Sequence, residues 1–250
     1  MKLLRFKSDN VEKKGVIENN RIRRVLGNFF TDYTLIDEYY EFSEVKILPP
    51  INPEKIICVA RNYIDHAKEL NNPIPIKPLL FLKPPSSIIA HNEPINYPTI
   101  SNRVEHEGEL GVIIGKKGKN IAEVDAFKHI LGYTCFNDIT ARDIQIEEKN
   151  FTTAKSFDTF APIGPLIETE LDINSAAISV YVNNQLKQFG YLRDMIFSIE
   201  KLISYISTIM TLQVGDVIAT GTPPGVSALK KGDNVKVEIS GLSTLNNYVV

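Results

Sequence analysis

The sequence predicts an α+β fold that consists mostly of β-strands, with a small N-terminal unit in front of a larger domain. Three observations carry this prediction. Most apolar runs have the length of strands and are separated by turns that contain Gly, Pro and Asn. A longer helical periodicity occurs only in IAEVDAFKHIL and DMIFSIEKLISYISTIM. The proline-rich segment ILPPINPEK separates the first part of the chain from the rest.

The N-terminal unit spans residues 1–48 and is expected to be a small α/β appendage. KLLRFK predicts a strand, and GVIENNRIRRVLG predicts a hairpin that turns at Asn19 and Asn20. TLIDEYYEF predicts a short helix. Because Pro49, Pro50 and Pro53 make a stiff connection, we place the domain boundary there and expect residues 49–250 to form the main domain.

The main domain begins with KIICVA, which predicts a buried strand. RNYIDHAKEL has a brief helical periodicity and precedes the proline-rich NNPIPIKP, so we predict that this lid segment, residues 61–78, is mobile. Further strands are predicted in PLLFLK, SIIA, ELGVIIG, ILGYTCF, GPLIET, AISVYVNN, DVIATG and NVKVEIS. In the second helix, one stripe is expected to pack into the core: Met195, Ile199, Leu202, Ile206 and Ile209.

Composition excludes several classes of partner. The chain has 28 Lys and Arg against 30 Asp and Glu, and its net charge of −2 gives no general attraction to nucleic acid or anionic membranes. No P-loop or GxGxxG offers a site for a nucleotide. MKLLRFKSDN is too weakly apolar for a signal peptide and no run has the length of a membrane span, so we expect a cytoplasmic protein. Cys58 and Cys135 lie in apolar runs, where buried free thiols are expected.

Alternating carboxylates next to an apolar strand indicate a metal site. Glu105, Glu107 and Glu109 alternate in EHEGELGVIIG, and i, i+2 positions of a strand share one face at about 6 to 7 Å. Asp138 follows the apolar run ILGYTCF. We predict that Glu107, Glu109 and Asp138 bind a divalent cation, because these hard donors suit Mg²⁺, Mn²⁺ or Ca²⁺ better than zinc. The alternatives are surface alternation for the glutamates, and for Asp138 an Asx turn or helix cap with Asp143 nearby.

Three carboxylates around one divalent cation leave one negative charge in surplus, so an anionic substrate requires further cations. Lys155, Arg142 and Lys83 are the candidates. Lys155 lies between small and apolar residues in TTAKSFD, where a partly buried ammonium can stabilise an enolate, although it can also pair with Asp158. Arg142 suits either a substrate carboxylate or a structural ion pair. Lys83, before two prolines in FLKPPSS, has solvation as its alternative.

His66 and Glu69 stand at i, i+3 in the lid segment, so on a helix they share a face and can form a general-base pair, or an ordinary surface pair. Gln145 can orient a water molecule or remain an exposed amide.

Backbone and side-chain donors for the substrate are expected in two further places. TGTPPGV, residues 220–226, offers the N–H of Gly221 and the hydroxyl of Thr222 to a carboxylate, or forms only a tight turn. Arg61, which opens the lid segment, is a further candidate for binding the substrate.

Seven motifs resemble the fumarylacetoacetate hydrolase family in their order and in their residues, over about residues 55 to 247: ICVARNYIDHAKEL, FLKPPSS, VEHEGELGVIIG, GYTCFNDITARDIQ, FTTAKSFDTFAPIGP, LQVGDVIATGTPPGV and NVKVEISGLSTLNN. The resemblance implies a mixed β-sandwich roll in the main domain and a homodimer. It also implies Mg²⁺ or Mn²⁺ at Glu107, Glu109 and Asp138, with Lys155 as the active-site lysine.

Members similar to acylpyruvate hydrolases and oxaloacetate decarboxylases carry residues that match His66, Glu69 and Gln145. One departure is Ala60, where many members have Gly in the turn before the lid.

These features predict a metal-dependent enzyme that acts on 2-oxo acids through an enolate. The leading expectation is C–C bond hydrolysis of acylpyruvates, with oxaloacetate decarboxylation as a further activity, and His66 with Glu69 activating the water. The first alternative is an isomerase of 2-hydroxyhepta-2,4-diene-1,7-dioate and related diacids. The alternative from another class is a metal-binding protein without catalysis.

Overall fold

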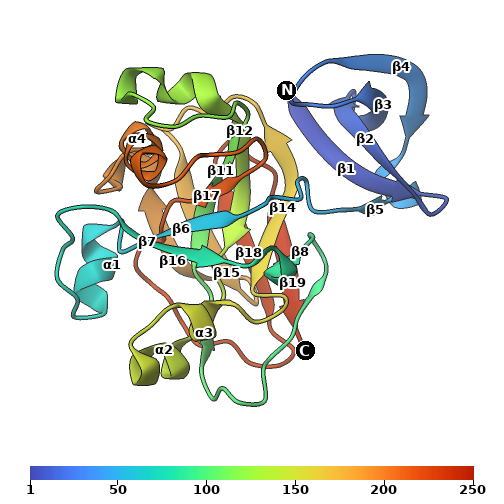
Figure 1. The fold of residues 1–250 in the computed structure, drawn as a ribbon. Coiled ribbons are helices and arrows are strands. Elements are labelled where there is room, and N and C mark those ends of the chain that lie inside the picture. Colours follow the sequence, from blue (N-terminus) through green and yellow to red (C-terminus); the bar gives the residue numbers. More distant parts are fainter.

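Two β-sheets that pack face to face form the framework of the protein in the computed structural model, which describes residues 1–250 (Figure 1). The larger sheet has the order β4-β3-β2-β1-β14-β12-β11-β17-β6-β7, and two short strands join it, β5 on β1 and β8 on β14. Its strands from the main part of the chain are β14 (Ala161–Glu168), β12 (Ile130–Asn137), β11 (Gly108–Ile114), β17 (Val217–Ala219), β6 (Ile56–Ala60), the edge strand β7 (Leu79–Lys83) and the short β8 (Ile88–Ile89). Most neighbours are antiparallel, whereas β6 runs parallel to β17 and β8 runs parallel to β14.

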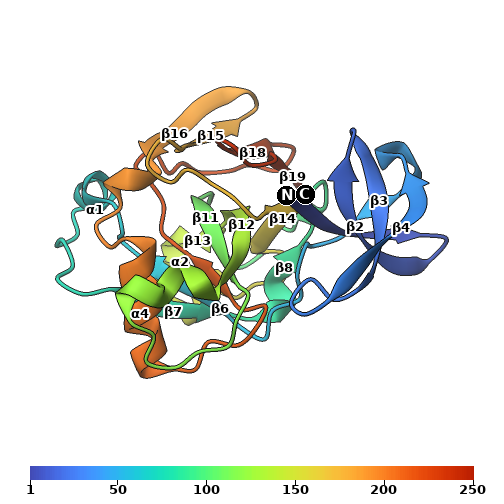
Figure 2. The ribbon, with the colours of Figure 1, turned by 90° about the horizontal axis from the view of Figure 1, so that it is seen from above.

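The second sheet has the order β16-β15-β18-β19-β9 and lies across β11, β12 and β14 (Figure 2). Its strands are β15 (Ala177–Val182), β16 (Gln185–Tyr191), β18 (Asn234–Ile239), β19 (Leu245–Val249) and β9 (Pro94–Ile95). The largest core cluster contains Leu110 and Val112 of the first sheet together with Val180 and Val237 of the second. The predicted α+β class with a mixed β-sandwich is confirmed.

The N-terminal strands continue the larger sheet, because Leu3 of β1 pairs with Ile167 of β14 (Figure 1). They are β1 (Lys2–Ser8), β2 (Val11–Glu18), β3 (Arg21–Gly27), β4 (Tyr33–Tyr40) and β5 (Lys46–Ile47). The expected hairpin is present, with Asn19 and Asn20 at positive φ in its turn. The helix predicted in TLIDEYYEF is wrong: the segment forms β4, whose aromatic and β-branched side chains pair with β3 instead of forming a helix.

The helices are short and lie at the margins of the sheets: α1 (Ile64–Glu69), α2 (Arg142–Glu148), α3 (Thr152–Lys155) and α4 (Ile199–Ile209). IAEVDAFKHIL forms a 3₁₀-helix, η3 (Glu123–His129), instead of an α-helix; only Ala126 of this helix is buried, so no apolar stripe favours the α form. α4 begins later than predicted, at the N-cap Ser198, which accepts a hydrogen bond from Lys201 N–H. Ile209 of its predicted core stripe is exposed.

The fold also tests the expectation for the two cysteines. Cys58 and Cys135 are buried and form no disulfide, as predicted. None of the helices combines the length and the apolar character that a membrane crossing requires.

Candidate active site

Strand alternation at the start of β11 gives the site its first two carboxylates. Glu107 and Glu109 point to one side, and Gly108 between them faces the second sheet. A Cβ at Gly108 would lie 2.3 Å from Cγ2 of Val180, so only glycine allows the two sheets to approach here. The second sheet thereby fixes which face of β11 carries the acids.

Asp138 completes the group because it follows β12 directly. Gly108 pairs with Asn137 across the ladder, and Asp138 N–H donates to Glu107 O at 2.8 Å. The candidate ligand oxygens of Glu107, Glu109 and Asp138 all lie within 4.8 Å of one another, and each residue is at most 5 % exposed. We call this group the carboxylate wall; its burial rules out the alternative of surface alternation.

Two lysines neutralise part of the carboxylate wall. Lys155 Nζ lies 2.7 Å from Glu107 Oε2 and 2.6 Å from Asp138 Oδ2, so the alternative pairing with Asp158 is not formed. Lys83 Nζ lies 2.5 Å from the other oxygen of Asp138 and donates to Ile139 O at 3.0 Å. Lys83 is 1 % exposed, which contradicts the alternative of a solvated side chain.

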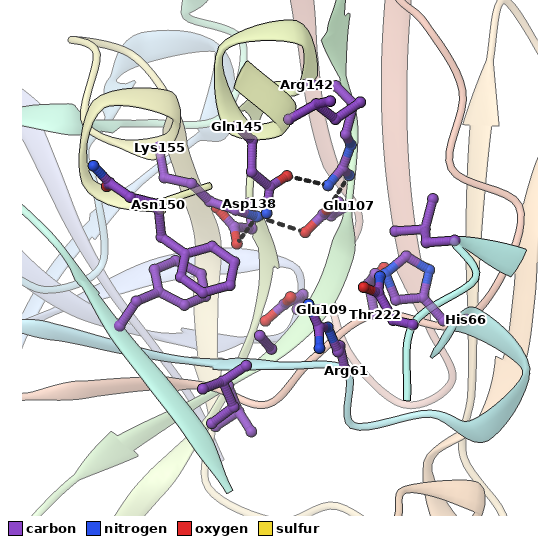
Figure 3. Close-up of a pocket in the computed structure, with 18 of the residues that line it drawn as sticks. Arg61, His66, Glu107, Glu109, Asp138, Arg142, Gln145, Asn150, Lys155 and Thr222 are labelled. Carbon is purple, nitrogen blue, oxygen red and sulfur yellow. Dashed lines mark hydrogen bonds and ion pairs between the residues drawn. The ribbon is translucent and has the colours of Figure 1, made fainter. Parts of the chain in front are cut away.

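Arg142 at the start of α2 forms the structural ion pair that was one of its two predicted roles. Its Nε donates to Glu105 Oε2 at 2.7 Å, its Nη2 donates to Glu107, and its Nη1 donates to Gln145 Oε1 (Figure 3). Glu105 is fully buried and also accepts from Arg103. It therefore anchors Arg142 behind the wall and does not join the predicted ligands.

These contacts separate the pKa values of the carboxylates. Burial raises the pKa of Glu107, but Lys155 and Arg142 outweigh it and bring that pKa well below its ordinary value. Burial raises the pKa of Glu109 well above its ordinary value, and the charges of Asp138 and Glu107 add to this effect. Burial lowers the pKa of Lys155, but Asp138 and Glu107 outweigh it, so the ammonium stays charged. The charge that lacks a neutralising partner is therefore that of Glu109.

Glu109 is also the acid with a free coordination position. It accepts one hydrogen bond, from Gly221 N–H at 2.9 Å, and contacts no cationic side chain. A divalent cation between the three carboxylates would remove the repulsion that raises its pKa. The donor set is three hard oxygens with no sulfur or imidazole, which fits Mg²⁺ or Mn²⁺. The carboxylate wall can therefore bind a divalent metal.

The lid segment brings the predicted His66 and Glu69 pair to the same pocket. His66 Nδ1 lies 3.2 Å from Glu69 Oε2, and the other carboxylate oxygen accepts from Gly225 N–H at 3.0 Å. His66 is only 4 % exposed, and no protein group hydrogen-bonds its Nε2. Figure 3 shows the ring at the pocket margin beside Thr222. The arrangement leaves one imidazole nitrogen available to a ligand.

The predicted substrate donors of the 220–226 loop are already engaged. The N–H of Gly221 is used by Glu109, and Thr222 Oγ1 donates to Gly108 O at 2.7 Å. Gly221 has φ +99°, and a Cβ there would lie 2.6 Å from Asn62 Cβ. In this structure the loop holds the carboxylate wall in place and offers the substrate no free N–H at Gly221.

Two buried side-chain amides, which the sequence does not predict to be part of the site, hold the 220–226 loop and the start of the lid segment. Gln188 of β16 accepts from Gly108 N–H at 3.1 Å and donates to Thr222 Oγ1 at 2.7 Å, and its Oε1 lies 2.9 Å from His106 Nδ1. Asn62 donates to Phe197 O and Thr220 O and accepts from Phe197 N–H. Their partners lie far away in sequence, so no local pattern signals them.

The pocket between the carboxylate wall and the lid segment has a volume of about 570 Å³. This volume suits a small molecule. Nine of the predicted site residues line it: Arg61, His66, Glu107, Glu109, Asp138, Arg142, Gln145, Lys155 and Thr222 (Figure 3). Glu69, Lys83 and Gly221 support it from behind. One pocket thus unites the candidate metal ligands, a buried lysine and an available imidazole.

Comparisons with known proteins place the chain among its relatives. Residues 55–250 match the family model described as fumarylacetoacetate (FAA) hydrolase C-terminal, and residues 1–50 match one described as Rv2993c-like, N-terminal. A protein of Archaeoglobus fulgidus is 48% identical over 94% of this chain and 94% of its own length. The oxaloacetate tautomerase YisK of Bacillus subtilis is 41% identical over 84% of this chain and 75% of its own.

The fold is shared with solved structures along its whole length. A structure described as 2-hydroxyhepta-2,4-diene-1,7-dioate isomerase from Mycobacterium marinum has a TM-score of 0.93 and 35% sequence identity. The match covers 100% of this chain and 98% of the Mycobacterium marinum chain.

Proposed function

The chain belongs to the fumarylacetoacetate hydrolase family, and from that premise we propose that it is a metal-dependent enzyme that interconverts the keto and enol forms of a 2-oxo acid. One observation carries this proposal: the unengaged Nε2 of His66 shares one pocket with the carboxylate wall and Lys155. A proton acceptor and an enolate-stabilising centre are the two components that such a reaction requires.

Glu107, Glu109 and Asp138 would hold Mg²⁺ or Mn²⁺, which when bound supplies a Lewis acid for the 2-oxo group. Lys155 contributes a buried ammonium beside Glu107 and Asp138, and its raised pKa keeps it charged. The ammonium favours negative charge on the substrate oxygen, so it stabilises an enolate more than a neutral ketone.

His66 is the proposed acid–base group. In ketone-to-enol conversion, Nε2 accepts a proton from C3, the C–H electron pair becomes the C2–C3 double bond, and the carbonyl π electrons move to the oxygen. Solvent then gives a proton to this oxygen, and the imidazolium returns its proton to solvent, so no net proton is gained or lost. Glu69 Oε2 lies 3.2 Å from Nδ1, and a hydrogen bond donated by Nδ1–H to this carboxylate would select the tautomer in which Nε2 can accept the proton. The same carboxylate stabilises the imidazolium that results.

The test is the decay of enol-oxaloacetate, followed by its ultraviolet absorbance with Mg²⁺ present. The wild type is expected to accelerate ketonisation, while His66→Ala is expected to lose about 100-fold or more of this rate, the scale of one general acid–base group. Lys68→Gln, on the exposed side of the same helix, serves as the matched control and should retain the rate. No acceleration by the wild type, or full activity of His66→Ala, would contradict the proposal.

C–C hydrolysis of acylpyruvates is the second candidate, and the His66–Glu69 pair also favours it. The same Nε2 can accept a proton from water that attacks a distal carbonyl, and Lys155 then stabilises the pyruvate enolate that leaves. Release of pyruvate from acetylpyruvate distinguishes this candidate. Its appearance with the wild type and its loss in Glu69→Ala would establish hydrolysis, and a wild type that enolises without releasing pyruvate would exclude it.

Two further candidate functions can be distinguished by separate assays. Isomerisation of a 2-hydroxy-diene diacid needs the same proton transfer without water, and the Mycobacterium marinum neighbour motivates its assay. A metal-binding protein without catalysis would melt at a higher temperature with Mg²⁺ and turn over no 2-oxo acid. The proposed homodimer is tested separately by light scattering.

A further inference from the structure

A second cavity, with a volume of about 630 Å³, lies outside the candidate active site. It is bounded by η3, by the first half of β12 and by the chain that leads into α4, and η3 and α4 lie side by side (Figure 1). No residue lines both this cavity and the pocket of the carboxylate wall. Asp138 follows the far end of β12, so the two spaces lie at opposite ends of one strand.

The floor of the second cavity is apolar. Tyr133, Leu192 and Ile199 line it, and each of them is at most 6 % exposed. Phe127 of η3 also lines the cavity, although nearly half of this residue is exposed. Water in contact with such a surface is displaced favourably by an apolar group, so the floor favours a ligand with an apolar body.

The hydroxyl of Tyr133 has no partner in the protein. The side chain is almost completely buried, yet its hydroxyl makes no hydrogen bond to a protein group. Burial raises the pKa of Tyr133 to about 12, and the charge of Glu200, another residue of the lining, contributes to the increase. The hydroxyl therefore lies near the carboxylate of Glu200 and keeps its proton. Because buried hydroxyls normally have hydrogen-bond partners, this group favours a ligand that supplies one.

The charges of the lining are unbalanced. It carries the three carboxylates of Glu170, Asp172 and Glu200 against one cation, Arg193. The guanidinium is already engaged, because it donates a hydrogen bond to Asn174 O at 3.0 Å. Glu200 is only partly exposed and forms no ion pair. The cavity therefore has a surplus of negative charge close to the free hydroxyl, which is complementary to a cation.

One wall of the cavity also supports the lid segment. Leu192 and Met195 line the cavity, and Met195 forms an isolated β-bridge with Tyr63. The next residue, Ile196, donates its N–H to Asn62 O at 2.8 Å. A ligand that packs against Met195 thus contacts the same short stretch of chain that holds the start of the lid segment.

We propose that this cavity is a regulatory site for a small organic cation, an ammonium group on an apolar body, and that its occupant stabilises the lid segment. The ammonium binds between the carboxylate of Glu200 and the hydroxyl of Tyr133, while the apolar body covers Leu192 and Ile199. Opening of the chain around Met195 would release the ligand, so the bound ligand opposes that opening.

Phenethylammonium is the test ligand, and 2-phenylethanol, which has the same ring and chain length without the charge, is its control. Titration followed by backbone-amide NMR shifts locates and measures binding. Phenethylammonium should bind at least about 10-fold more tightly than 2-phenylethanol, and Glu200→Gln should weaken it about 10-fold, the value of one charge-assisted hydrogen bond. Tyr133→Phe should weaken it severalfold. Glu123→Gln removes an exposed carboxylate that pairs with Lys201 outside the cavity, and should change nothing.

Hydrogen exchange of residues 64–70, measured by mass spectrometry, tests the effect on the lid segment. At a phenethylammonium concentration of ten times the dissociation constant, an opening that releases the ligand is suppressed about 11-fold. The amides of the lid segment should therefore exchange severalfold more slowly in the wild type. In Glu200→Gln, at the same concentration, exchange should slow by no more than about twofold. Neither measurement needs turnover of a 2-oxo acid, so the result is independent of the proposed function.

Three outcomes overturn the inference. Absent binding, or equal affinity for phenethylammonium and 2-phenylethanol, would show that the cavity does not select a cation. An affinity that falls equally in Glu200→Gln and Glu123→Gln would show a diffuse attraction to an acidic surface instead of a site. Binding in the cavity that leaves the exchange of residues 64–70 unchanged would show that its occupant does not act on the lid segment.

Discussion

The carboxylate wall and the lid segment face each other across one pocket, but they are built differently. The wall lies on central strands of the larger sheet and is at most 5 % exposed. The lid segment carries a six-residue helix without a side-chain N-cap, followed by a loop in which Ile76 is 97 % exposed. In the proposed function, the buried wall therefore sets the class of chemistry, because it would bind the cation beside which an enolate forms. The lid segment carries His66 and Glu69, the pair that we propose transfers the proton.

The largest expected effect comes from unbalancing the carboxylate wall. Lys155→Met leaves Glu107 and Asp138 each without one buried partner, so the metal-free protein should lose about 3 to 5 kcal/mol of unfolding free energy. Mg²⁺ should restore part of the loss because it supplies the missing positive charge. Urea denaturation with and without Mg²⁺ measures both effects. Lys128→Met, which removes an exposed lysine paired with Asp125, is the control and should leave stability unchanged.

Glu109→Gln should not lower the unfolding free energy of the metal-free protein, because Glu109 is the carboxyl that no cation neutralises. The metal-free variant should be at least as stable as the wild type at neutral pH, while its Mg²⁺ affinity should fall about 100-fold or more. The pH dependence follows from the sign of the shift. A raised pKa means that metal-free Glu109 holds a proton above pH 4.5, so Mg²⁺ must displace it and wild-type affinity should rise with pH.

Calorimetry in buffers of different ionisation enthalpy measures the proton released on metal binding. An affinity that does not depend on pH, or a strongly destabilised Glu109→Gln, would show that Glu109 is ionised and stabilised by another group.

The carboxylate wall could be predicted from sequence because its signals are local. Alternation fixed the common side of Glu107 and Glu109, and the strand end placed Asp138. The roles of Glu105 and Gln188 could not be predicted, because they depend on partners 37 and 80 residues away. The buried ion pair of Lys83 could not be predicted either, because only the folded chain brings Asp138 and Ile139 O next to its ammonium.

The fold shows the same division between local and distant signals. Strands with continuous apolar runs, such as β11 and β12, were predicted. β16 and β19 were not: β16 is a mostly exposed edge strand, and β19 carries Asn247, whose amide is buried by hydrogen bonds to Ala90 O and Glu93 O. Asparagine normally indicates a turn, and here tertiary contacts override that preference.

The smallest expected effect concerns the hinge of the lid segment. Asn62→Ala removes three hydrogen bonds that fix the chain between β6 and α1, so amides of residues 64–70 should exchange faster and KM should rise severalfold, with kcat less affected. Hydrogen exchange measured by mass spectrometry tests this prediction. Asn92→Ala, at a distant turn, is the control. Faster exchange throughout the sheets in Asn62→Ala would indicate global destabilisation instead of a local hinge.

The most direct test of the account is the exchange of C3 hydrogens of 2-oxobutanoate in D₂O, followed by proton NMR. This substrate cannot be hydrolysed or decarboxylated by the proposed steps, so exchange reports enolisation alone. The wild type with Mg²⁺ should catalyse exchange, Glu109→Gln should lose it through loss of the metal, and His66→Ala should lose it although it still binds Mg²⁺. Exchange that continues undiminished in His66→Ala, or its absence from the metal-loaded wild type, would contradict the claim that one pocket joins the carboxylate wall to a proton-transfer group.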